Sequence, residues 1–148
     1  MSDTSFDFWI GEWDVRWTDA DGHPQSGSNS VRLVEGTIRE LFCAPEPAGP
    51  YIGASVSRWD GEAGAWVQDY WDNRGYSAVF QGSFDGRLLV LERASHVETV
   101  APTRLVWSDI RTESITWNYE RQTDSGVWES TWRILYVRKD PTGATQPS

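Results

Sequence analysis

The sequence predicts an all-β protein whose strands form a closed, up-and-down antiparallel barrel of about eight to ten strands. Two observations carry this prediction. Apolar residues alternate with polar ones in segment after segment, and turn residues such as Gly, Asp and Asn recur about every dozen positions. Because an open sheet leaves two unpaired edges, a closed barrel is favoured over an open sandwich.

The chain is organised around its opening aromatic stretch, 6–17. After Gly11 the pattern has a period of two, so Trp13, Val15 and Trp17 share one face of a half-buried first strand. The aromatic residues before Gly11 are expected to form a short helical turn that plugs one end of the barrel.

The remaining strands follow from alternating stretches that end at turn residues. Asp85-Gly86 is the strongest short hairpin signal, and the proline-rich stretch 44–50 is predicted to be a rim loop because proline cannot pair inside a sheet. Residues 1–5 and 139–148 are expected to be flexible, and the whole chain is expected to form one domain. The predicted later strands are 27–34, 37–43, 51–59, 65–72, 77–84, 87–96, 103–110, 114–122 and 127–138.

Composition and charge exclude several classes of partner. The net charge is −9 and the pI is about 4.6, so the chain lacks the basic face that nucleic acids or anionic membranes require. Cys43 is the only cysteine, which rules out an intrachain disulfide. We see no signal peptide and no apolar run long enough to cross a bilayer, so a cytoplasmic protein is expected.

The ten tryptophans point to a cavity with flat aromatic walls. On the last strand, Trp128, Ser130 and Trp132 are predicted to share one face. For any single tryptophan, packing in the core is the competing interpretation. The candidate ligand-binding residues are Trp17, Trp66, Trp107, Trp117, Trp132 and Tyr136.

Three polar residues are candidates for catalysis. Tyr70 can donate to a ligand carbonyl, and an inward Glu40 would have its pKa raised by burial and could exchange protons with a ligand. His96 could act as a general base at the barrel mouth. The competing interpretations are a structural tyrosine, an ion-paired glutamate and an exposed rim histidine. With two separated histidines and no cysteine partner, no metal site and no cofactor are expected.

The Gly11-x-Trp13 motif on a first strand resembles the lipocalin and fatty-acid-binding-protein superfamily. The wider stretch 6–15 is similar to a bacterial lipocalin-like (calycin-type) family of unknown function. The resemblance implies a calycin-type barrel that binds a ligand. It also implies that Trp13 closes the barrel bottom beneath an arginine of the last strand, either Arg138 or Arg133. Further matches are Trp59-Asp60, Gly64-x-Trp66, Trp107 with Ile110, Trp117 with Glu120, and Trp128, Trp132, Tyr136 and Arg138.

Ten-stranded haem-binding relatives use a late histidine as an axial ligand. This chain has no histidine after His96, so haem is not expected.

Three functions are consistent with this sequence. The first is a carrier or sensor that holds a small apolar or planar metabolite. The second is a cofactor-independent cyclase, isomerase or dehydratase acting on a polyketide-like small molecule. The third is a cavity-free structural module. The expected partner is a small molecule, and a homodimer is left open.

Overall fold

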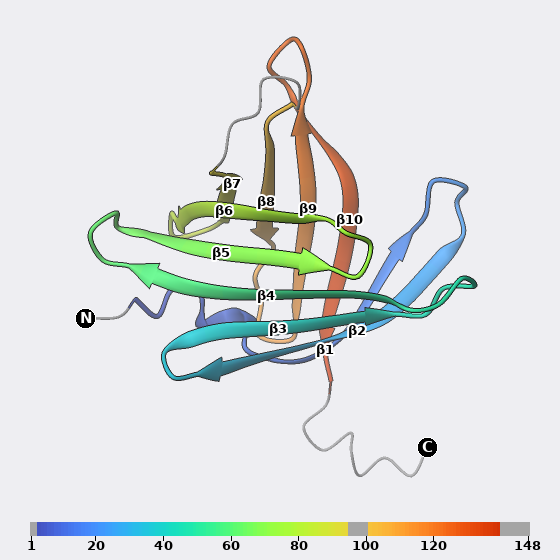
Figure 1. Cartoon of the computed structure of the whole chain (residues 1–148), viewed down its shortest axis with the longest axis horizontal. Helices are drawn as coiled ribbons and strands as arrows, with labels where there is room; N and C mark the ends of the chain where they lie inside the picture. The colour runs from blue at the N-terminus through green and yellow to red at the C-terminus, as the bar shows by residue number, and fades with distance from the viewer. Residues whose placement is uncertain (1–2, 95–100, 140–148) are drawn as a thin grey trace.

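The computed structural model describes residues 3–94 and 101–139 and shows a closed barrel of ten strands (Figure 1). Each strand pairs antiparallel with the next one in the chain, and β1 pairs with β10 to close the barrel. The predicted up-and-down barrel is therefore confirmed, and it is consistent with a lipocalin-like fold. The elements are η1 (Asp7–Trp9), β1 (Gly11–Thr18), β2 (Pro24–Val34), β3 (Thr37–Ala44), β4 (Tyr51–Asp60), β5 (Ala65–Asp72), β6 (Ser77–Phe84), β7 (Leu89–Arg93), β8 (Thr103–Ser108), β9 (Ser114–Gln122) and β10 (Trp128–Arg138).

Predicted and observed strand boundaries agree closely. The predicted ranges 65–72, 77–84 and 114–122 coincide with β5, β6 and β9. Strand β7 begins later than predicted because the Asp85 carboxylate accepts hydrogen bonds from the backbone N–H groups of Arg87 (2.8 Å) and Leu88 (2.7 Å). These bonds draw both residues into the turn. The predicted end of this strand, at residue 96, lies outside the described residues.

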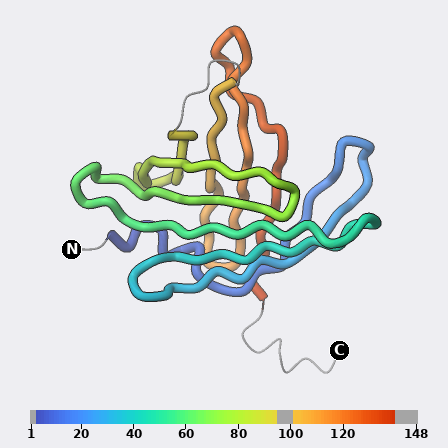
Figure 2. Tube along the Cα trace, viewed as in Figure 1, coloured from blue at the N-terminus to red at the C-terminus, as the bar shows by residue number. Residues whose placement is uncertain are grey.

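The chain meanders around the barrel, as the trace in Figure 2 shows. Strands β3 to β6 run across one side, and β8 to β10 cross behind them on the other side (Figure 1). The contact between β1 and β10 is short: it runs only from Trp13 opposite Arg138 to Arg16 opposite Leu135. Within the described residues, no helix is long and apolar enough to cross a bilayer.

The opening aromatic residues plug one end of the barrel, as predicted. Phe6 and Trp9 are almost completely buried, and their rings stack with centroids 5.1 Å apart. The edge of the Phe6 ring also meets Trp66 at 5.3 Å and Trp107 at 5.1 Å. Because these large side chains fill the space between the walls, this end of the barrel is a packed core.

Arg138 is the arginine that lies over Trp13. Its guanidinium carbon is 4.1 Å from the Trp13 ring centroid, and its N–H groups donate to the backbone oxygens of Ile10 (2.8 Å) and Phe8 (3.2 Å). Gly11 makes this arrangement possible. Its φ is +147°, and a Cβ atom there would lie 2.2 Å from Arg138 Nη1.

A β-bulge changes the face of β10 between Ser130 and Trp132. Beyond the bulge Trp132 faces the interior. Before it, Trp128 lies on the outer surface, where its ring centroid is 4.2 Å from the guanidinium carbon of Arg104. The prediction that Trp128 and Trp132 share a face is therefore wrong, because the extra residue shifts the alternation by one.

Candidate functional site

A cavity of about 260 Å³ lies inside the barrel above the plug. Trp9 and Trp107, which pack against Phe6, belong both to the plugged end and to the cavity lining. The volume is near the lower end of the range for small-molecule sites, about 300 Å³. The space is therefore sized for a compact ligand.

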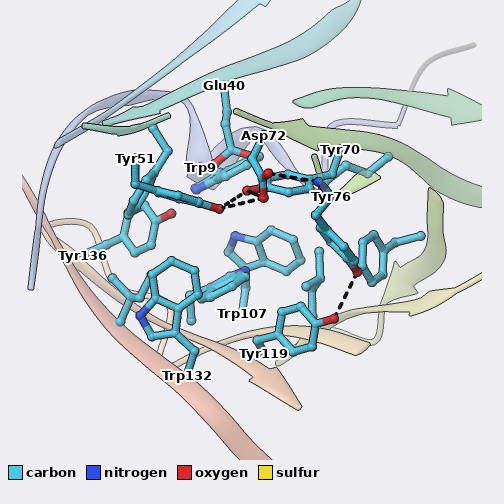
Figure 3. Close-up of a pocket in the computed structure, with 16 residues that line it drawn as sticks. Trp9, Glu40, Tyr51, Tyr70, Asp72, Tyr76, Trp107, Tyr119, Trp132 and Tyr136 are labelled. Carbon is cyan, nitrogen blue, oxygen red and sulfur yellow. Dashed lines mark hydrogen bonds between the residues drawn. The ribbon is translucent and has the colours of Figure 1, made fainter. Parts of the chain in front are cut away.

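The cavity has two chemically different walls (Figure 3). Strand register explains the polar wall. Glu40 on β3 lies opposite Ser55, which lies opposite Tyr70 on β5, so this wall presents polar groups. The polar wall contains Glu40, Tyr51, Gln68, Tyr70 and Asp72. The facing wall, from β8 to β10, contains Leu105, Trp107, Trp117, Tyr119, Trp132 and Ile134.

Glu40 is held in position from both sides. Its carboxylate accepts a hydrogen bond from Ser55 Oγ (2.6 Å) and another from Asn29 Nδ2 (2.8 Å). Burial raises the pKa of the Glu40 carboxyl above its ordinary value, and these two hydrogen bonds partly oppose that effect. The result is a fixed carboxyl group on the cavity wall that holds its proton to higher pH than a surface glutamate does.

Asn29 connects Glu40 to Tyr136. The same Asn29 amide nitrogen donates to Tyr136 Oη over 2.8 Å, and both residues are almost completely buried. Burial and then the negative charge of Glu40 raise the pKa of Tyr136 well above its ordinary value. Tyr136 is therefore a neutral hydrogen-bonding group beside the Glu40 carboxyl.

A second polar cluster lies where β4 begins and β5 ends. The hydroxyls of Tyr51 and Tyr70 are hydrogen-bonded to each other, and each is 3.3 Å from Asp72 Oδ2 (Figure 3). Gly53 leaves room for this pair, because a Cβ atom there would lie 2.6 Å from Tyr70 Oη. Burial raises the pKa of Tyr51 to about 12 and also raises the pKa of Tyr70, so both phenols stay protonated at neutral pH.

Three buried indole N–H groups on the cavity lining donate to no acceptor within the described residues. They belong to Trp9, Trp107 and Trp132. Trp9 is 1% exposed and Trp107 is 0% exposed. A buried donor without a partner costs about 1–3 kcal/mol, so these groups favour a ligand that supplies acceptors.

The structure brings most of the predicted site residues to one cavity. Tyr70 and Glu40 line it, as do Trp107, Trp117, Trp132 and Tyr136. His96 lies outside the described residues, so its proposed role stays a prediction.

Two predicted ligand-binding tryptophans do not line the cavity. Trp66 faces inward but lies at the plug level, where its ring meets Phe6 and its indole N–H donates to Ser5 Oγ over 3.4 Å. Trp17 packs with ring-centroid distances of 5.5 Å to Trp132 and 5.9 Å to Phe42, and it lines a separate groove between β1 and β10, beyond the end of their pairing at Arg16.

Sequence reasoning missed several lining residues, among them Trp9, Tyr51, Asp72, Tyr76 and Tyr119. Alternation within their strands places Tyr51 and Tyr119 on the inner face. Asp72 ends β5 on the same face as Gln68 and Tyr70, so alternation also indicates its direction, whereas Tyr76 lies in the following turn, where alternation gives none. Trp9 was assigned to the plug, whose inner side also forms the cavity floor.

Asp19, Asp21 and His23 also bring potential metal ligands within 4.8 Å of one another, in the turn between β1 and β2. The turn itself explains this proximity. Asp19 Oδ1 accepts the backbone N–H groups of Asp21 and His23, both over 2.9 Å. We therefore assign no ion to this exposed cluster.

Comparison with known families and proteins adds no assignment. No protein-family model matches this chain, and no curated protein matches its sequence. The functional argument therefore rests on the geometry of the cavity.

Proposed function

We propose that this protein binds a small, planar and largely apolar molecule inside the barrel, as a carrier or sensor. The unpartnered indole N–H groups of Trp9, Trp107 and Trp132 carry this proposal. They favour a ligand that presents oxygen or nitrogen acceptors to an otherwise apolar wall. A cavity of about 260 Å³ also argues against the cavity-free structural module.

The aromatic wall supports a flat ligand. Trp132 packs edge-on against Trp117 with ring centroids 5.6 Å apart, and Trp117 does the same with Tyr119 at 6.5 Å. These contacts fix the ring orientations in the free protein, so little side-chain freedom is lost when a ligand binds. Rigid rings suit a rigid, planar partner.

The opening motif supports the same proposal. We propose that the chain belongs with the bacterial lipocalin-like proteins because its opening stretch 6–15 is similar to theirs, and the position of Arg138 over Trp13 supports this proposal. Barrels of that type commonly enclose one small ligand.

Filling the cavity should weaken ligand binding without unfolding the barrel. Leu105 lines the cavity, so we expect Leu105→Trp to weaken binding of N-phenyl-1-naphthylamine, 2-tetralone and flavone by about tenfold or more. Dye fluorescence and quenching of tryptophan emission measure the affinities.

The matched control is Leu41→Trp, which adds the same ring at a side chain that is 51% exposed. It should bind like the parent protein, and circular dichroism should show the same fold in both variants. Equal affinity in Leu105→Trp would move the site elsewhere. No binding of any of the three compounds to the parent protein would overturn the proposed function.

Glu40 favours a second candidate function, a cofactor-independent isomerase. An ionised Glu40 carboxylate would take a proton from a carbon beside a ligand carbonyl, and the resulting carboxyl would return the proton to another carbon of the same ligand. The indole N–H groups of Trp107 and Trp132 would donate to the enolate oxygen. Reactant and product have the same composition, so no co-reactant is required.

Proton exchange tests this second candidate without knowledge of the natural substrate. We expect the protein to accelerate solvent deuterium exchange beside the carbonyl of 2-tetralone, measured by NMR in D₂O. Glu40→Gln should remove the acceleration but retain binding of N-phenyl-1-naphthylamine. If 2-tetralone binds without accelerated exchange, or if Glu40→Gln exchanges at the parent rate, the protein acts on such ligands only as a binder.

A further inference from the structure

Arg93 faces the barrel interior at the open end. Arg93 ends β7 and lies opposite the buried Phe80 on β6, on the same face as the buried Leu89 and Leu91. Its guanidinium carbon is 5.9 Å from the ring centroid of Tyr76, which lines the cavity. In a chain of net charge −9, an inward arginine at the cavity mouth is a distinctive feature.

Two buried polar atoms on neighbouring strands at this end of the barrel lack partners. Arg93 Nε and Thr103 Oγ1 have no hydrogen-bond partner among the described residues. Glu92 lies opposite Arg104 in the strand register, so the next residues toward the mouth, Arg93 on β7 and Thr103 on β8, lie side by side. Thr103 is 6% exposed, so its hydroxyl is withdrawn from bulk solvent.

Two tyrosines extend this polar group into the cavity. Tyr76 Oη and Tyr119 Oη are hydrogen-bonded over 3.0 Å, and both side chains line the cavity (Figure 3). Desolvation raises the pKa of Tyr76, so its hydroxyl keeps its proton. This side of the mouth therefore offers hydrogen-bond donors beside the positive charge of Arg93. Arg121 on β9 lies opposite Thr103 and shares this face, but it is exposed and lies opposite Glu129 on β10.

Two acidic groups near the mouth have other partners. Asp72 accepts hydrogen bonds from Tyr51 and Tyr70 on the opposite side. Glu120 forms an ion pair of 2.7 Å with Arg104. Within the described ranges 3–94 and 101–139, none of the ion pairs includes Arg93.

We infer that Arg93, with Thr103 and Tyr119, forms a subsite for a carboxylate carried by the ligand whose planar body occupies the cavity. A guanidinium fork and a hydroxyl match the two coplanar oxygens of a carboxylate. Arg93 supplies one partly buried positive charge, and the charge of the exposed Arg121 is opposed by Glu129 on the neighbouring strand, so a carboxylate is favoured over a doubly charged phosphate. The inference rests on the proposed function and narrows its ligand class to planar carboxylic acids.

A matched set of naphthalenes tests the subsite. 2-Naphthoate, 2-naphthamide and 2-naphthyl phosphate share one ring system and differ in the charge of the attached group. Their affinities follow from displacement of N-phenyl-1-naphthylamine from the cavity. We expect the parent protein to bind 2-naphthoate about tenfold more tightly than 2-naphthamide. It should also prefer 2-naphthoate to 2-naphthyl phosphate.

Arg93→Gln should abolish the preference for 2-naphthoate and leave the 2-naphthamide affinity unchanged. Thr103→Val, which keeps the shape of the side chain, should reduce the preference about threefold. The control is Arg87→Gln, which makes the same charge change in the turn before β7, at the plugged end. It should keep the preference in full.

The outcomes separate this inference from the proposed function. If 2-naphthoate keeps its advantage in Arg93→Gln, or loses it equally in Arg87→Gln, the subsite is overturned although the cavity still binds ligands. If 2-naphthyl phosphate binds most tightly, the site takes phosphates and the carboxylate assignment is wrong. If Arg93→Gln fails to fold, Arg93→Lys and Thr103→Val test the subsite instead. Both variants must then lower the preference for 2-naphthoate over 2-naphthamide. If neither the dye nor any naphthalene binds the parent protein, the proposed function fails as well.

Discussion

Replacing Trp13 with alanine is expected to lower the free energy of unfolding by about 3–5 kcal/mol. Trp13 is 0% exposed, and its indole N–H donates to the backbone oxygen of Trp9 over 2.8 Å. Its ring also supports Arg138 at 4.1 Å and packs edge-on against Tyr136 at 5.7 Å. The substitution therefore leaves a large cavity and removes the support of the arginine that ties the last strand to the plug.

Urea denaturation followed by circular dichroism measures this loss. The control is Trp71→Ala, which removes the same side chain from a position that is 46% exposed. This control should change the unfolding free energy by less than about 1 kcal/mol. A loss at Trp13 no larger than that at Trp71 would show that the plugged end does not stabilise the barrel.

Glu40 is expected to make the barrel less stable as the pH rises. Burial raises the pKa of the Glu40 carboxyl above the ordinary value of 4.5. At a pH between the pKa of the unfolded state and that of the folded state, the folded protein therefore binds more protons than the unfolded chain. The stabilising contribution is therefore complete below about 4.5 and is lost as the pH rises through the folded-state pKa. The limiting slope is about 1.4 kcal/mol per pH unit.

Urea denaturation of the parent protein and Glu40→Gln across this pH window measures the effect. The amide does not ionise, so the difference between the two unfolding free energies should shift in favour of the variant as the pH rises. Glu129→Gln makes the same change at an exposed position on β10 and is the matched control. A constant difference for Glu40→Gln would mean that this carboxyl ionises as a surface glutamate does.

The sequence contained most of the strand pattern, because alternation and turn chemistry are local. β5 and β6 were predicted to the residue, and so was the face of Trp13 and Val15. The bulge after Ser130 was not predicted, because no glycine or proline marks its position in the sequence. The bulge turns Trp128 to the outer surface, and this depends on how β9 and β10 pair, which cannot be read from the sequence.

Prediction of the site was limited by the stagger of the strands. Trp66 and Trp107 both face inward, but stagger places Trp66 entirely in the plug, whereas Trp107 reaches the cavity. Alternation gives the face of a residue but not its height along the barrel axis. The cluster of Tyr51, Tyr70 and Asp72 depends in the same way on how β4 and β5 align.

The short contact between β1 and β10 has a consequence for synthesis. The seam joins the first strand to the last, so a growing chain cannot complete the barrel until Arg138 has emerged from the ribosome. Until then β1 is an open sheet edge with unpaired backbone groups, next to the aromatic residues of the plug. Nascent chains of this protein are therefore most exposed to aggregation just before translation of β10 ends.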